Sequence, residues 1–452
     1  MDVPTLFIEL PDNSDLTELK EKDTYLTADI NFQSNGYAED VEVSGLSIKG
    51  RGNSTWSAIK KPYRLKFGKK ISLGGLPKSK NYALLANYFD QTKLKNAIAF
   101  FLGKGLGVEY TNSCIPVNVV LNGTEKGIYL LTNKLGINGA SVDIEENKGI
   151  LFELSSEMDE DFNFRSPIYN LPIMVKDPDL SEIAEEIPDK SAEDLFGEWQ
   201  RDFENAEKSV EEGKGFDAFD LESFVNVMLV QNFMGNTEIQ GPKSFYIYKR
   251  QLSPTDIETS PEESEGNDND VEDSTIADSS NETNNPDDSG NPDDPVNPDD
   301  PVNPDDPDDP AISQTDEKYY FGPLWDFDIA LNRKKTWSDG SFGPLSPTAT
   351  TPLHPFFTAL MESPDFWVAY KERAEYLIDK IYPELIDFID RQALLLEPSA
   401  KVDGLLWPDD PEATSFAAAM SCFDYMNIVK ELKEWLEIRK EFIQTRAQEN
   451  KW

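Results

Sequence analysis

The chain has 452 residues, of which 85 are acidic and 42 are basic, so its formal net charge is −43. This balance argues against a protein that binds the phosphate backbone of nucleic acid, and the length favours about two or three domains. The one histidine, His354, excludes multi-histidine zinc sites. The two cysteines, Cys114 and Cys422, form no Cys-x-x-Cys pair, which excludes structural zinc, and we interpret them as buried free thiols rather than a bridge.

The first 150 residues predict a mostly antiparallel sheet with one inserted helix. Alternating or short apolar runs predict its strands, and Asn122-Gly123 is typical of a hairpin turn between two of them. A stripe of apolar residues, ended by glycines, predicts the helix over residues 92–105. The strands are expected at residues 5–10, 25–32, 41–49, 61–67, 82–86, 115–121, 128–132 and 149–154.

Helical spacing dominates from residue 180 onward. Residues 180–235 predict helices, the last of them a mostly apolar and therefore buried helix over 216–233, and a strand is expected at 245–249. From His354 the pattern predicts a helical bundle packed on the second lobe, with helices at 366–381, 383–396, 415–419 and 427–448. No apolar run reaches the length of a transmembrane helix, and the first residues are not typical of a secretion signal.

Residues 251–318 form a tract rich in Pro, Asp, Asn and Ser that holds 23 acids and one base, Lys318. Dense like charge and few apolar residues predict a disordered acidic insert in a hairpin loop, between the strand at 245–249 and another at 319–324. Calcium binding is the alternative, but no spacing resembles an EF-hand loop. For its role, we favour a tolerated extension of a surface loop over a segment that recruits basic substrates.

A cationic segment ends the third predicted strand and begins the fourth. Backbone N–H groups at the glycine-containing turn of residues 51–56 can cradle phosphate, and cations on a strand can pair with it. In the strand that follows, three aromatic or apolar residues face one side, whereas Arg64 and Lys66 face the other. The alternative is a solvated strand face without a ligand.

Two acidic motifs lie in the second half of the chain. Asp326 and Asp328 follow the strand at 319–324 and can hold a divalent ion or cap a turn, but they do not oppose each other across a sugar ring as in a glycosidase. Glu238, in the polar loop after the buried helix, can be a general base or part of a plain loop. The order of these features along the chain is that of a protein kinase: a cationic sheet, a buried helix, a loop with a carboxylate, a strand and an Asp-Phe-Asp motif.

Several motifs together resemble the CotH (spore-coat protein H) kinase family. They are residues 51–56 with 61–67, 84–87 with Asp90, Leu94 and Asn96, 119–123 with 127–132, and 243–249 with 325–328. The resemblance extends over residues 4–440 apart from the acidic insert. It implies an atypical protein-kinase-like fold that uses ATP and Mg²⁺ or Mn²⁺ to phosphorylate Ser or Thr of secreted or coat proteins.

The resemblance also assigns roles to site residues. Asp326 corresponds to the metal-binding Asp, with Asp328 and Asn236 as further ligands, and Glu238 takes the place of the catalytic Asp. Contacts to the nucleotide and its phosphates are expected from Arg51, Arg64, Lys66, Asn133 and Glu153.

Three positions depart from the family pattern. Glu238 is one methylene longer than Asp, Asn133 stands where many members have Glu, and Lys243 stands where ordinary kinases have a metal-binding Asn. A carboxylate displaced by about 1 Å can cost on the order of 100-fold in rate. Replacements for the missing groups are expected from Glu153, Asn236 or Ser244.

Together these patterns predict an α+β, kinase-like bilobal fold. Residues 1–150 form a β-rich nucleotide-binding lobe, and residues 151–452 form a helical catalytic lobe interrupted by the insert. The predicted function is phosphoryl transfer to a protein substrate, and the alternative is a catalytically inactive surface scaffold that binds a partner protein or a glycan. The family implies a bacterial protein that is extracellular or associated with the cell surface, without nucleic acid or an integral membrane segment as part of its function.

Overall fold

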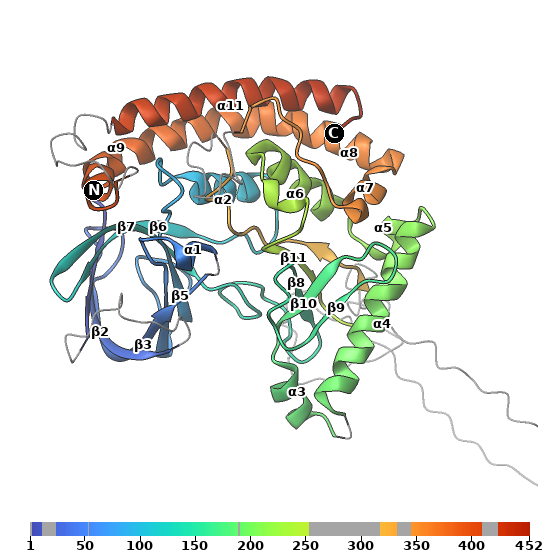
Figure 1. The fold of residues 1–452 in the computed structure, drawn as a ribbon, viewed down its shortest axis with the longest axis horizontal. Coiled ribbons are helices and arrows are strands. Elements are labelled where there is room, and N and C mark those ends of the chain that lie inside the picture. The colour runs from blue at the N-terminus through green and yellow to red at the C-terminus, as the bar shows by residue number, and fades with distance from the viewer. Residues whose placement is uncertain are drawn as a thin grey trace, which may run out of the picture. The chain divides into compact units, whose positions relative to one another are not determined.

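The computed structural model describes residues 2–10, 24–52, 54–188, 190–252, 317–331, 345–408 and 424–452. Sheets and helices are both extensive, so the predicted mixed α/β composition is confirmed (Figure 1). The predicted insert lies almost wholly outside the described residues, as do Cys422 and the helix expected at 415–419. In the described part of the chain, no helix combines the length and the apolar character that crossing a bilayer requires.

The predicted N-terminal sheet is closed into a seven-stranded barrel, which the sequence patterns did not indicate (Figure 1). Every neighbouring pair is antiparallel except the first and sixth strands, whose parallel pairing closes the barrel. In barrel order the strands are β1 (Thr5–Glu9), β2 (Leu26–Gln33), β3 (Val41–Gly50), β4 (Tyr63–Ile71), β5 (Ser79–Leu85), β7 (Thr124–Asn133) and β6 (Cys114–Leu121).

The alternation predicted for β4 is confirmed. Tyr63, Leu65 and Phe67 are buried in the barrel interior, whereas Arg64 and Lys66 lie on its outer face. The predicted hairpin between β6 and β7 is also present, and both of its turn residues have the positive φ values that this tight turn requires. Part of the outer face of β5 and β7 joins a second apolar core, which is shared with the helices.

A second, five-stranded antiparallel sheet follows the barrel. Its strands, in sheet order, are β12 (Tyr320–Phe321), β11 (Phe245–Lys249), β8 (Ile150–Leu154), β10 (Pro172–Asp177) and β9 (Asn163–Arg165). We did not predict β9 and β10, because we assigned no structure to residues 155–179. The strand expected at 319–324 is shorter than predicted, since Pro323 has no N–H to donate to a ladder.

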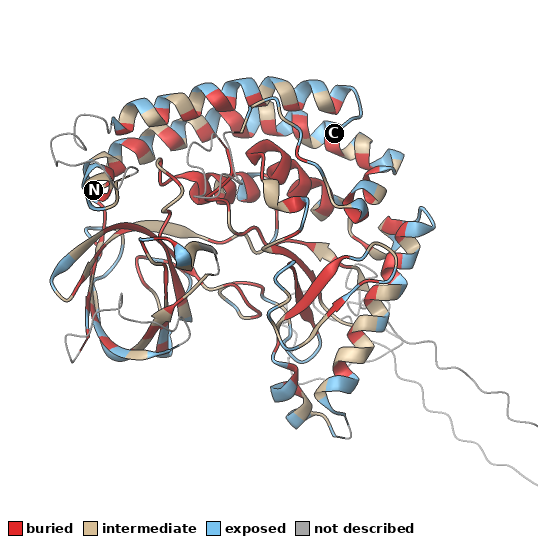
Figure 2. Ribbon diagram, in the orientation of Figure 1, coloured by how far each residue is buried: buried red, intermediate tan, exposed pale blue. Residues whose placement is uncertain are grey.

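Several helices precede the insert, and two of them, α4 (Ala192–Glu211) and α6 (Leu221–Met234), pack against this sheet. The buried helix expected at 216–233 is divided into two, because the Asp220 side chain accepts a bond from the Ser223 N–H (2.7 Å) and starts a new helix there. That new helix, α6, is buried on nearly all sides (Figure 2). In chain order, the helices before the insert are α1 (Ser54–Ser57), α2 (Lys95–Gly105), α3 (Leu180–Glu186), α4 (Ala192–Glu211), α5 (Gly215–Ala218), α6 (Leu221–Met234) and η2 (Thr237–Ile239).

We predicted that the C-terminal helices pack on the second lobe. In the structure, one of them, α9 (Tyr382–Leu406), also contacts the barrel. Asp403 of α9 bonds to the backbone N–H of Ile128 in β7 (3.0 Å), so this helix also holds the barrel. It is longer than expected and contains Pro398, whereas α11 matches its prediction closely. The elements are α7 (Pro355–Met361), α8 (Pro364–Tyr376), η4 (Leu377–Ile381), α9 (Tyr382–Leu406) and α11 (Tyr425–Gln448).

Candidate active site

Three predicted acidic residues come together in the structure. Glu238 lies in η2, and Asp326 and Asp328 lie in the loop after β12. Desolvation raises the pKa of Glu238 well above its ordinary value, and the charges of Asp326 and Asp328 raise it further. The two segments are more than 80 residues apart in sequence, yet their carboxyl groups lie within electrostatic reach.

The end of α6 positions Glu238. Gly235 ends the helix with a φ of 60°, and the Asn236 N–H bonds back to the Gln231 carbonyl at 3.0 Å. The Asn236 side chain accepts from the Glu238 N–H (3.2 Å) and donates to the Gln231 side chain (2.9 Å). Asn236, a predicted metal ligand, therefore has a shaping role in this loop.

The loop that carries Asp326 and Asp328 is fixed by its backbone. Asp326 has a φ of 65°, a left-handed conformation that Asp tolerates better than most residues. The next N–H, of the buried Phe327, donates to Asn96 Oδ1 at 2.8 Å. The Lys95 ammonium donates to the Asp328 carbonyl at 3.2 Å, so the start of α2 holds the loop from one side.

The start of α2 is itself ordered by Asp90, which is fully buried. One carboxylate oxygen accepts from the Thr92 N–H (2.8 Å) and hydroxyl (2.6 Å), and the other accepts from the Lys95 N–H (2.8 Å). The Asn96 amide also donates to Asn87 Oδ1 at 3.2 Å. These bonds give a physical role to Asp90 and Asn96, which belong to the motifs that resemble the CotH family.

Negative charge at this site is poorly compensated. Desolvation and the neighbouring Asp326 raise the pKa of Asp328 to about 8, and Lys95 opposes the shift. The pKa of Asp326 is also raised, mainly by desolvation, while Arg51 opposes that shift. Glu238 Oε2 is buried, and no group among the described residues forms a hydrogen bond with it. Buried carboxylates left in this state are the donor type that a hard divalent cation prefers.

No group of three or more His, Cys, Asp or Glu residues in the described ranges is arranged to hold a metal ion. Magnesium does not need such a cage, because it usually takes one or two carboxylates together with water and substrate phosphates. The orphaned Glu238 oxygen and the two aspartates therefore fit an ion that arrives with a nucleotide. Asp326 and Asp328 are the residues that would hold it.

Arg51, at the end of the barrel strand β3, faces the acids. Its guanidinium lies 5.3 Å from the centre of the Trp325 ring, and its backbone N–H bonds to the Pro62 carbonyl at 3.2 Å. Desolvation lowers its pKa, whereas the charge of Asp326 opposes that shift. Arg64 also lies within electrostatic reach of Arg51, and its buried Nε has no hydrogen-bond partner in the part of the chain that the structure describes. Two predicted phosphate ligands thus lie near the carboxylates.

Glu153 of β8 lies on the same side of the site. Its carboxylate is 2.9 Å from the Lys176 ammonium, which also pairs with Glu160 at 2.8 Å. Neither Lys176 nor Lys134 belongs to the motifs identified in the sequence. Burial and the charge of Arg64 lower the pKa of Lys134 to about 8. A lysine inside the apolar run of β10 was the available signal for Lys176.

Two predicted nucleotide-binding residues make their contacts elsewhere. Lys66 is exposed and lies 6.0 Å from the centre of the Tyr25 ring. The Asn133 amide donates to the Pro77 carbonyl at 3.0 Å, next to the barrel rather than the carboxylates. Lys243, the third departure from the family pattern, forms an ion pair with Glu157.

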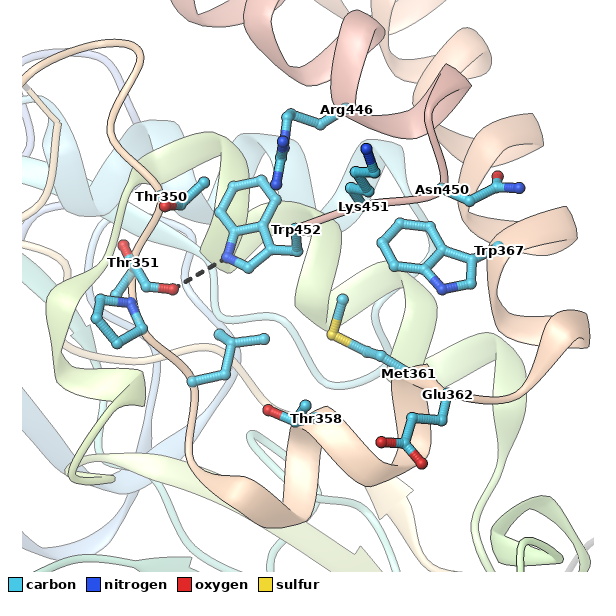
Figure 3. Close-up of a pocket in the computed structure, with 12 residues that line it drawn as sticks. Thr350, Thr351, Thr358, Met361, Glu362, Trp367, Arg446, Asn450, Lys451 and Trp452 are labelled. Carbon is cyan, nitrogen blue, oxygen red and sulfur yellow. Dashed lines mark hydrogen bonds between the residues drawn. The ribbon is translucent and has the colours of Figure 1, made fainter.

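A separate cavity of about 460 Å³ lies among the C-terminal helices (Figure 3). The Trp452 indole donates to the Thr351 carbonyl at 3.1 Å across it, and Trp367 and Arg446 also line it. None of the predicted site residues contributes to its wall. It is therefore distinct from the carboxylate site.

Comparison with known proteins supports the motif analysis. The model of the family described as CotH kinase protein matches residues 48–266, which confirms the resemblance for this part of the chain. The matched segment includes Arg51, Arg64, Glu153 and Glu238 but ends before Asp326. No curated protein matches the chain.

Proposed function

We propose that this protein is an ATP- and divalent-metal-dependent kinase that phosphorylates Ser or Thr of secreted or surface proteins. The observation that carries the proposal is the meeting of Glu238, Asp326 and Asp328 opposite Arg51. Phosphoryl transfer depends mainly on positioning and on neutralising phosphate charge, and carboxylates beside guanidinium groups are the parts it needs. The barrel and the helical region would then be the two lobes of a kinase-like fold.

Each residue has one task in this proposal. Arg51 and Arg64 neutralise phosphate oxygens, and the ion held by Asp326 and Asp328 supplies further charge neutralisation when nucleotide is bound. The acceptor hydroxyl oxygen forms a bond to the γ-phosphorus as the bond to ADP breaks. Glu238 takes the hydroxyl proton, which requires its carboxylate form. Because the pKa of Glu238 is raised, transfer should increase with pH as this group loses its proton.

The first test is thermal unfolding with and without ATP and Mg²⁺ or Mn²⁺, followed by transfer of label from γ-labelled ATP. Asp326→Ala should abolish the metal-dependent rise in the midpoint temperature of unfolding. It should also lower the rate of phosphoryl transfer about 1000-fold while the fold remains intact. Asp387→Asn, an exposed substitution on α9, is the matched control and should change neither. Full activity in Asp326→Ala would exclude this residue from the site. Label from the α-phosphate would indicate nucleotidyl transfer instead.

A non-catalytic scaffold is the second candidate, and two contacts and one raised pKa favour it. Asn133 is engaged by Pro77, Lys243 is paired with Glu157, and Glu238 holds its proton more tightly than an ordinary carboxyl group. A scaffold of this kind would bind its partner protein or glycan without transfer. Binding of nucleotide without phosphoryl transfer would favour the scaffold over the kinase. So would an unchanged midpoint temperature of unfolding at saturating nucleotide and metal.

A further inference from the structure

One surface of the barrel is unusually basic for so acidic a chain. Residues 43–89 contain ten basic residues and no acidic residue, although acids outnumber bases two to one in the whole protein. Five of these bases are exposed lysines on the hairpin formed by β4 and β5. We call this surface the lysine hairpin, and it consists of Lys66, Lys69, Lys70, Lys78 and Lys80.

The charges of the lysine hairpin are not compensated within the described residues. None of its five ammonium groups forms an ion pair there, and the cross-strand neighbours of Lys66 are the neutral Ser47 and Asn81. Some exposed lysines elsewhere do pair with carboxylates, as in Lys190–Glu198 at 2.6 Å. Among the residues that the structure describes, the lysine hairpin is therefore a cluster of five neighbouring exposed lysines without ion pairs, on a chain with an excess of acids.

This patch is continuous with the candidate active site. Arg64 precedes Lys66 on the same outer face of β4, and its guanidinium donates to Asn81 Oδ1 at 2.8 Å. Arg64 in turn lies within electrostatic reach of Arg51, which faces Asp326. Positive charge thus extends from the carboxylate site along β4 to the tip of the hairpin.

We propose that the lysine hairpin binds an acidic segment of the acceptor protein, an inference that rests on the proposed kinase function. The acceptor would carry its Ser or Thr beside a short run of Asp or Glu. A short segment can contact the hairpin alone, because charges further than about 8 Å are largely screened at physiological ionic strength. A long polyanion would extend over the acidic remainder of the surface and be repelled.

The composition of the patch differs from that of the carboxylate site. All five exposed bases are lysines, which act as point charges and can pair with a run of carboxylates without a fixed bidentate geometry. The two arginines of this region, Arg51 and Arg64, lie next to the carboxylate site instead. The proposed division is therefore phosphate at the arginines and acidic acceptor at the lysines.

Binding is measured first, on the full chain and without nucleotide. The probe is a fluorescent acidic peptide with one Ser within a run of Asp and Glu. The test variant changes the five hairpin lysines to Gln. The matched control changes five exposed but paired lysines to Gln, namely Lys148, Lys190, Lys214, Lys401 and Lys430.

We expect the wild type and the control to bind the peptide with an affinity that falls as salt rises, and the hairpin variant to bind at least about tenfold more weakly. Equal affinity for the two variants, or no binding by the wild type, would overturn the proposal. An oligonucleotide or inorganic polyphosphate that binds the hairpin more tightly than the peptide would overturn it in favour of a phosphate polymer.

Transfer is measured second, with the acidic peptide and a neutral Ser peptide as acceptors. The hairpin variant should have a raised KM for the acidic acceptor, an unchanged kcat, and unchanged transfer to the neutral one. An unchanged KM would overturn the docking site and leave the kinase proposal standing. If the acidic peptide binds through the lysine hairpin but no phosphoryl transfer occurs to either peptide, the hairpin is not an acceptor site and the kinase proposal is overturned with it.

Discussion

Two clusters of buried charge in this protein differ in how well they are satisfied. In the first, Asp403 of α9 lies between the ammonium groups of Lys60 and Lys93, with Lys93 at 2.9 Å, and also accepts from the Ile128 N–H. In the second, Asp326 and Asp328 raise the pKa of Glu238, Asp326 also raises that of Asp328, and Glu238 Oε2 has no hydrogen-bond partner among the described residues.

The pKa values of the two clusters move in opposite directions. Desolvation would raise the pKa of Asp403, but Lys93 and Lys60 outweigh it and hold that pKa below its ordinary value. Desolvation and mutual repulsion raise the pKa of all three acids in the second cluster. A satisfied cluster stabilises the folded chain, whereas an unsatisfied one costs stability and is typical of a functional site. We therefore interpret the first as structural and the second as the site.

The largest expected effect comes from breaking the satisfied cluster. Asp403→Ala would remove the carboxylate that lies between two buried ammonium groups, those of Lys93 and of the fully buried Lys60. Removing one partner of a buried charge pair typically costs about 3–5 kcal/mol. We expect the free energy of unfolding, measured by denaturant titration, to fall by about this amount.

The control for this experiment is Asp390→Ala on the same helix. Asp390 pairs with Lys433 at 2.6 Å, but its side chain is 48% exposed. Exposed ion pairs contribute about 0–1 kcal/mol, so this variant should be almost as stable as the wild type. Equal losses in the two variants would contradict our distinction between buried and exposed pairs on α9.

The Asp403 cluster also shows what the sequence alone did not reveal about the fold. Alternation in β4 correctly assigned Tyr63 and Arg64 to opposite faces, because strand periodicity is a local property. Closure of the barrel and its contact with α9 depend on pairings between distant segments. Lys60 and Asp403 are 343 residues apart, and neither belongs to a motif that indicates the other.

The second effect should be a gain in stability. Asp328 has a pKa of about 8 in the folded protein, against 3.8 ordinarily, so between these values the folded state binds more protons than the unfolded state. Its contribution to stability therefore falls as pH rises from about 4 to 8. Asp328→Asn should remove that slope and raise the free energy of unfolding by about 2 kcal/mol at pH 8 without metal.

The measurement is denaturant unfolding of wild type and Asp328→Asn at several pH values in the presence of a chelator. Asp403 should contribute the opposite slope to the dependence of stability on pH. Its pKa is lowered in the folded protein, so the stability that it contributes is lost only as pH falls into the acidic range. If the free energy of unfolding of the wild type falls no more steeply toward pH 8 than that of Asp328→Asn, the pKa of Asp328 is not raised in the folded protein as we infer.

The candidate site was predictable only where its chemistry is carried by motifs. Glu238, Asp326 and Arg51 stand in recognisable segments, and the structure brings them together. Lys134 was missed because a single lysine in otherwise ordinary sequence gives no signal until the fold places it near Arg64. Lys176 was missed because no strand was predicted at residues 172–177, although its position in an apolar run was a signal. Conversely, Lys66 was grouped with Arg64 on strand periodicity, which fixes the face but not the distance to a site.

The smallest expected effect concerns how the unsatisfied cluster is held in place. Asn96→Ala would remove the acceptor of the buried Phe327 N–H, and the loss of one such bond costs about 1 kcal/mol. The effect on metal-dependent nucleotide binding should be larger than this loss implies, because the bond fixes the backbone between Asp326 and Asp328. Asn427→Ala, which removes an exposed bond to Glu431, is the control. If nucleotide affinity in Asn96→Ala equals that of the control, the loop is ordered by other contacts, and Asn96 supports only the fold.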